Sequence, residues 1–285
     1  MINQILKSVA VLIVISNGLA AQNVCNRFQA TRDRCDLNAG PVEQAKCLLR
    51  PVKKFANLGA PLQELPAPLD TLVGQPTTTT RDQLKRFLAA KGIREADVGG
   101  ALSVSLPAAK YFVIHDTSDL LTSNEFPSTI NDAASSLNNL SRRVTRKVAH
   151  LYIDRTGRSA TAVNFESSTP PSGTKFGSCH RSQRTAFLHI ENIQPRIRDR
   201  SVRFPNDALA PDPGFSEAQL ERLALVYVVA SVRSGKWLIP AYHSPIDLGF
   251  PDRHDDPQNF DLQMWAEKLR GLIEEIRNET QGDGL

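Results

Sequence analysis

Three residues that follow apolar segments could together hold a metal ion. His115 follows the apolar run 111–114, and His243 follows the run 237–240. Asp256 lies further along, in an acidic loop. A catalytic zinc ion needs about three ligands from His, Asp, Glu or Cys, with one position left open. Each of these residues, taken singly, also suits a structural role, so their types alone indicate only a possible metal site.

Short apolar segments between helices would have to position these side chains. The runs 111–114, 148–153 and 186–190 are apolar and rich in strand-forming residues, and each predicts a buried strand. A helix is predicted over residues 128–142, between the first two. Strands that alternate with helices predict an α/β fold with a central sheet flanked by helices. The functional residues are then expected at strand ends and in the loops beyond them.

Two capping boxes mark the starts of helices. Thr80 with Gln83 predicts a helix that ends before Gly92, and Ser216 with Gln219 predicts a second. A third apolar stripe at helical spacing predicts a last helix, and consists of Leu262, Trp265, Leu269, Leu272 and Ile276.

Residues 1–21 have the pattern of a secretory signal peptide. Lys7 precedes the apolar run 9–15, and small residues follow at Ala20 and Ala21. An uncleaved membrane anchor is the alternative, but the run is too short to span a bilayer core of about 30 Å. We therefore expect an exported protein, periplasmic or secreted, with no stable membrane insertion after cleavage.

A proline-punctuated extension, residues 22–107, precedes the domain that we assign to residues 108–285. The extension is predicted to be helical or irregular and stapled by disulfides. An even number of cysteines suits an oxidising compartment, and they are Cys25, Cys35, Cys47 and Cys179. Sequence cannot choose among the three possible pairings. Proximity favours one bridge among the first three and one from that trio to Cys179.

The charge balance argues against nucleic acid as a partner. The chain has 34 basic and 30 acidic residues, a net charge of +4, and no dense basic tract. A slightly basic surface would suit an anionic partner such as a cell wall.

Four motifs in order resemble those of the type 2 zinc-dependent N-acetylmuramoyl-L-alanine amidases, the family of phage amidase-lysozymes and peptidoglycan recognition proteins. The resemblance covers roughly residues 108–272. The matching segments are 112–117 (FVIHDT), 149–158 (AHLYIDRTGR), 188–191 (LHIE) and the pair 242–247 (YHSPID) with 255–260 (DDPQNF).

This resemblance implies a mixed sheet with the metal at one end of a groove. It implies that His115, His243 and Asp256 bind Zn²⁺, and that Glu191 is the catalytic general base. Without the resemblance, a strand-end carboxylate such as Glu191 would more simply form a surface ion pair. The implied reaction is hydrolysis of the amide bond between N-acetylmuramic acid and L-alanine, with peptidoglycan or a muropeptide as substrate.

The chain departs from the family pattern at three places. His254, two residues before Asp256, stands where such amidases commonly carry a lysine that stabilises the developing oxyanion. A neutral imidazole donates a hydrogen bond without a permanent charge, so weaker or more acid-shifted activity is expected. A Trp-His-Ala-Gly stretch is replaced by residues 177–180 (GSCH), and His189 stands at a usually small position.

Two other functions remain open from the sequence. The chain could be a non-catalytic peptidoglycan recognition protein, although such proteins typically lose a zinc ligand. It could also be another secreted zinc amidohydrolase, because the geometry of a site rather than its fold sets the bond that is cleaved.

Overall fold

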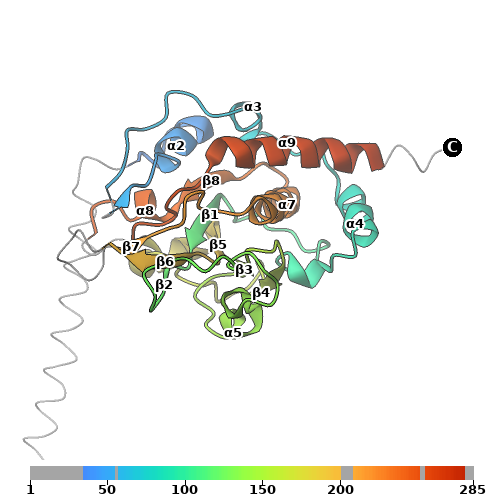
Figure 1. Ribbon diagram of the computed structural model, residues 1–285. Coiled ribbons are helices and arrows are strands. Elements are labelled where there is room, and N and C mark those ends of the chain that lie inside the picture. Colours follow the sequence, from blue (N-terminus) through green and yellow to red (C-terminus); the bar gives the residue numbers. More distant parts are fainter. Residues whose placement is uncertain (1–34, 55–56, 200–207, 251–253, 280–285) are drawn as a thin grey trace, which may run out of the picture.

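The computed structural model describes residues 35–54, 57–199, 208–250 and 254–279. These residues form the predicted α/β fold, in which helices and long loops surround a central sheet (Figure 1). The predicted signal peptide, residues 1–21, lies outside the described residues, as does Cys25.

The larger sheet has five strands in the order β4-β3-β5-β1-β8. Its strands are β1 (Tyr111–Asp116), β3 (Leu151–Ile153), β4 (Ser159–Thr161), β5 (Phe187–Asn192) and β8 (Ile239–Tyr242). The inner strand β1 pairs in parallel with both β5 and β8, and β3 is parallel to β5 but antiparallel to β4. The sheet is therefore mixed, and the three predicted strands correspond to β1, β3 and β5.

A smaller sheet continues from the ends of two of these strands. It has the order β2-β6-β7, and its strands are β2 (Asp119–Leu120), β6 (Pro195–Arg198) and β7 (Ala208–Leu209). Because β2 follows β1 and β6 follows β5, the small sheet lies just beyond the carboxyl ends of both central strands.

All three helices predicted from caps and stripes are present. They are α4 (Arg81–Ala90), α7 (Glu217–Ser234) and α9 (Leu262–Glu279), and α4 and α7 begin with the expected capping boxes. The remaining helical segments are α2 (Pro41–Leu48), α3 (Leu69–Leu72), η2 (Glu95–Asp97), η3 (Ser136–Asn138), α5 (Leu140–Val144), α6 (Lys175–Cys179), η4 (Arg181–Ala186) and α8 (His243–Ile246). No helix of the described residues is long and apolar enough to cross a membrane.

The prediction of a helix over residues 128–142 is wrong, because no continuous helix forms there. The segment consists of turns, the single turn η3 and the short helix α5. The side chain of Asn138 donates to the carbonyl oxygens of Ile130 and Asp132, and Asn139 caps α5 by accepting from the backbone of Arg142. Asparagine side chains offer the backbone such local alternatives to a continuous helix.

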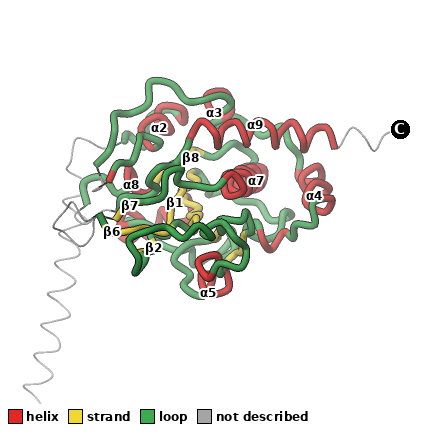
Figure 2. Tube along the Cα trace, viewed as in Figure 1, coloured by secondary structure: helices red, strands yellow, loops and turns green. Residues whose placement is uncertain are grey.

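The two faces of β1 pack against different elements because side chains alternate along a strand. Phe112 packs edge-on against Tyr227 of α7, with 5.2 Å between ring centroids. Tyr111, which points the other way, stacks on Phe187 at 4.6 Å. Helix α9 packs against α7 and crosses it on the outside of the molecule (Figure 2). His115 shares the face of Tyr111, away from these two long helices.

The described part of the N-terminal extension contributes to the same hydrophobic core as the sheet. Its helix α2 packs near β8, and Gln44 of α2 accepts a hydrogen bond of 2.6 Å from the Tyr111 hydroxyl. A disulfide joins Cys35 to Cys47, as expected for one bridge within the N-terminal trio. Cys179 is also disulfide-bonded.

Candidate metal centre

His115, His243 and Asp256 come together at one edge of the larger sheet. His115 lies near the carboxyl end of β1, and His243 opens α8 directly after the parallel neighbour β8. Asp256 lies in the loop before α9. All three side chains are buried, and one ligand atom from each lies within 4.8 Å of the others. The predicted ligands therefore form a group that could hold a metal ion.

The donor atoms of this group suit a cation. Nδ1 of His115 and Nδ1 of His243 lie 3.4 and 3.1 Å from Oδ2 of Asp256. The other carboxylate oxygen, Oδ1, lies 2.9 Å from His243 Nδ1 but is buried without a well-aligned hydrogen bond. Two imidazoles and one carboxylate are donors that zinc accepts. A buried oxygen that lacks a hydrogen-bond donor calls for another partner, and a metal ion fits that need.

A buried carboxylate orients His243. Nε2 of His243 lies 2.9 Å from Oδ2 of Asp247, which leaves Nδ1 free to face Asp256. Asp247 in turn accepts hydrogen bonds from the backbone N–H groups of Lys175, at 2.8 Å, and Phe176, at 2.9 Å. Hydrogen bonds of this kind fix the tautomer and ring orientation of histidine ligands.

A second histidine orients His115. Nε2 of His115 lies 3.0 Å from Nδ1 of His189, so a His115 ring that offers Nδ1 to a metal donates its Nε2 proton to His189. The backbone N–H of His189 donates to Nδ1 of His150, whose pKa burial lowers to about 3. Gly173 crosses the His189 ring so closely that a Cβ added to this glycine would lie 2.2 Å from Cγ of the ring. These contacts give the buried imidazole of His189 partners on both sides.

A buried ion pair joins the strands to the loop that carries Asp256. Nη2 of Arg196, on β6, lies 2.7 Å from Oδ2 of Asp116, the last residue of β1, and both side chains are buried. The same carboxylate oxygen accepts the backbone N–H of Gln258 at 3.1 Å. Asp255 lies 3.5 Å from Nη1 of Arg196. The pair therefore holds both flanks of Asp256 against the end of β1.

The charges of the group are strongly coupled. Burial, followed by the nearby His243, lowers the pKa of His115 to about 4. Burial also opposes the charged form of His243, but the carboxylates of Asp256 and Asp247 outweigh it and raise its pKa. For Asp256, burial is outweighed by the two histidines, which lower its pKa.

Glu191 lies on the neighbouring strand, level with the metal group. Its Cα is in register with His115 of β1 on one side and Tyr152 of β3 on the other. Its Oε2 atom is buried and has no hydrogen-bond partner among the described residues. Burial, reinforced by Asp256 and Asp116, raises the pKa of Glu191 well above its ordinary value. A carboxyl with a raised pKa next to a charged group is typical of a functional site.

These residues face one pocket of about 520 Å³. Glu191, Tyr152, His243, His254 and Asp256 are among the residues that line it. His254 lies at the rim with 62% of its side chain exposed, and its ring centroid is 5.0 Å from that of His243. Four of the five residues singled out in the sequence therefore line this pocket, and the fifth, His115, lies buried beside His243 and Asp256.

No protein-family model, curated protein or solved structure matches this chain. Function must therefore be inferred from its own residues. The sequence did not identify Asp247, Arg196 or Tyr152, and it gave no account of His189. Asp247 could have been found, because it lies four residues after His243, one helical turn away. Arg196 and His189 meet their partners only through strand pairing and carry no local signal.

We expect Arg196→Met to lower the free energy of unfolding by about 3–5 kcal/mol, because it leaves Asp116 buried without its counterion. Urea unfolding of the chelator-treated protein measures this change. As a control, Lys268→Met removes exposed contacts with Glu217 and Glu221 and is expected to cost less than about 1 kcal/mol. Equal small losses in the two variants would contradict a structural role for the buried pair.

We expect His189→Leu to weaken Zn²⁺ binding about 10–100-fold, because His115 loses the acceptor that fixes its tautomer. His189→Asn keeps an acceptor near the position of Nδ1 and should recover most of the affinity. Competition with a chromogenic chelator measures both variants against the unmodified protein. Unchanged affinity in His189→Leu, in a protein that still unfolds cooperatively, would show that His189 does not position the ligand.

Proposed function

We propose that this protein is an exported zinc-dependent amidase that hydrolyses the bond between N-acetylmuramic acid and L-alanine in peptidoglycan. The observation that carries the proposal is the buried His115, His243 and Asp256 group beside Glu191 in an open pocket. The motif order that resembles type 2 amidases supports the choice of bond.

The protein residues fit zinc as the metal. His115, His243 and Asp256 supply three ligands of the type found in catalytic zinc sites, which leave one position open. When bound, zinc polarises a carbonyl group and lowers the pKa of water from 15.7 to about 7. Asp247 and His189 hold the two histidine rings so that both Nδ1 atoms face the shared carboxylate.

Glu191 is the residue placed to move the proton. It accepts a proton from the attacking water as the water oxygen bonds to the carbonyl carbon, and it then gives the proton to the leaving nitrogen as the C–N bond breaks. The products are a muramyl carboxylate and a free L-alanine amine. The environment that raises the pKa of Glu191 makes it a stronger base, which suits this transfer.

His254 at the pocket rim is the candidate donor to the developing oxyanion. Its side chain is mostly exposed and its ring lies tilted near that of His243, so it can turn toward a bound substrate. A donor of this kind stabilises negative charge only where its N–H reaches the oxygen in the transition state.

Export is supported by the signal-like pattern in residues 1–21 and by the Cys35–Cys47 disulfide. Disulfides persist mainly in oxidising compartments such as the periplasm or the extracellular space. Peptidoglycan is accessible to a protein in either place.

Purified peptidoglycan should release stem peptides with a free N-terminal L-alanine when treated with the zinc-loaded protein. Chelator treatment and Glu191→Ala should each reduce the rate, the latter by about 10²–10⁴-fold, the contribution typical of a general base. Mass spectrometry with N-terminal labelling identifies the bond that is cut. Glu274→Ala, which alters an exposed acidic residue of α9, is the matched control and should retain full activity.

Each other outcome of this experiment identifies a different function. Sedimentation with peptidoglycan but no released peptide would favour a recognition protein. Zinc-dependent release of fragments with a different new terminus would indicate another amidohydrolase. A protein that neither bound peptidoglycan nor cleaved it would contradict the proposal.

His254→Lys should increase kcat, because an ammonium group keeps its positive charge from pH 5 to 8 and stabilises an oxyanion better than a neutral donor. His254→Ala should decrease kcat. Initial rates on soluble muropeptide across this pH range test both changes. A lower rate for His254→Lys at every pH would exclude His254 from the lysine-like role.

A further inference from the structure

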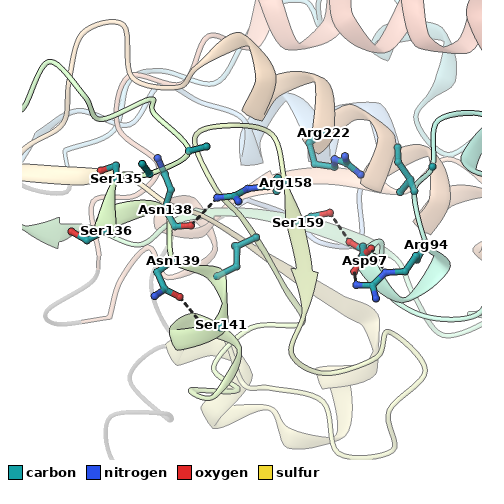
Figure 3. Close-up of a pocket in the computed structure, with 15 residues that line it drawn as sticks. Arg94, Asp97, Ser135, Ser136, Asn138, Asn139, Ser141, Arg158, Ser159 and Arg222 are labelled. Atoms are coloured by element: carbon teal, nitrogen blue, oxygen red, sulfur yellow. Dashed lines mark hydrogen bonds and ion pairs between the residues drawn. The ribbon is translucent and has the colours of Figure 1, made fainter.

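A second pocket, of about 610 Å³, lies on another part of the surface (Figure 3). Its walls come from residues 92–97 of the N-terminal extension, the segment 133–141, the start of β4 and one residue of α7. It shares no lining residue with the pocket at the metal centre. Its volume falls within the range of about 300–1,000 Å³ that is usual for small-ligand sites.

Three arginines line this pocket. Arg94 comes from the extension, Arg158 from the turn before β4 and Arg222 from α7 (Figure 3). Asp97 is the one acidic residue in its described lining. The lining is therefore positively charged, although the three cations come from segments far apart in the chain.

The three arginines differ in how far their charge is compensated. Arg94 makes two hydrogen bonds with Asp97, at 2.8 and 2.7 Å, and Arg158 makes one of 2.8 Å with the buried Asp154. Arg222 donates its Nε proton to the backbone oxygen of Gly157 at 2.7 Å. No ion pair of Arg222 with a carboxylate is present in the described residues, although Arg222 also lines a neighbouring pocket that includes Glu221, Glu267 and Glu275. Its two terminal nitrogens therefore remain available to an anion.

The environment of Arg222 favours an incoming anion. Its side chain is partly buried, and desolvation lowers the pKa of the guanidinium despite the more distant Asp97 and Asp154. A partly desolvated cation gains more from a bound anion than a fully hydrated one does. Ser135 and Ser136 add hydroxyl groups on the side of the pocket opposite Arg222 (Figure 3).

We propose that this pocket binds the oxyanion of a small polar ligand, a phosphate or carboxylate group, through the terminal nitrogens of Arg222. Guanidinium groups hold both kinds of oxyanion through paired N–H donors. Serine hydroxyls donate to the same oxygens or to the rest of the ligand. The proposal is independent of the metal centre, because the two pockets share no lining residue.

Titration with inorganic phosphate and, separately, with acetate tests this proposal by NMR of the full mature chain in phosphate-free buffer. We expect saturable shifts of amides in residues 92–97 and 133–141 and of the Arg222 side-chain Nε. Arg222→Gln should weaken binding about tenfold, in line with the loss of a hydrogen bond to a charged group. Arg222→Lys should retain part of the affinity. Lys268→Gln, which alters a half-buried residue of α9 outside the lining of this pocket, should retain all of it.

The two anions distinguish the source of the oxyanion. Tighter binding of phosphate supports a phosphorylated ligand, and tighter binding of acetate supports a carboxylate. The proposal is overturned if neither anion causes saturable shifts in these segments, or if Arg222→Gln binds as well as the unmodified protein while its spectrum shows an intact fold. Peptidoglycan cleavage measured on the same variants reports the metal centre separately.

Discussion

The buried ion pair between Arg196 and Asp116 is the constraint on which the arrangement of the metal centre depends. It joins the end of β1 to β6, and Asp116 also receives backbone and side-chain donors from Ser118 and Gln258. Burying two charges is costly, and such pairs contribute little net stability compared with apolar residues. What this pair provides is position. It fixes the loop around Asp256 against the strand that carries His115, so three ligands from distant segments meet.

The two histidines of the centre are held by partners of different charge. Asp247 gives His243 an anionic partner whose own oxygens are occupied by backbone N–H groups. His189 gives His115 a neutral partner, since burial and its histidine neighbours lower the pKa of His189 well below its ordinary value. A carboxylate partner increases the basicity of a histidine ligand more than a neutral imidazole does. Of the two partners of the histidine ligands, only Asp247 is therefore a carboxylate.

Much of this fold follows from local sequence signals, and the rest depends on pairing that no local signal reveals. Two capping boxes and an apolar stripe were enough to predict α4, α7 and α9, because caps and helical spacing act over a few residues. The expected helix over residues 128–142 failed because Asn138 bonds to backbone groups six and eight residues away. Motif order singled out five candidate site residues, and the fold brings three of them, His115, His243 and Asp256, into one group. Arg196 was not identified, and the role of His189 was not explained, because their partners, Asp116 and His115, are 80 and 74 residues distant.

The N-terminal extension supports the sheet at the first residue of β1 and also contacts α8, the helix that begins with His243. Gln44 of α2 bonds to Tyr111, the first residue of β1, whereas His115 and Asp116 close the same strand. Among the described residues, none from the extension lines the metal pocket, but residues 92–97 form a wall of the arginine pocket. The described extension is therefore a brace for the sheet and not a cover for the metal centre. The parallel neighbours restrain β1 unequally: β8 pairs with Tyr111–Ile114, whereas β5 pairs with the whole strand and so holds its last two residues, His115 and Asp116.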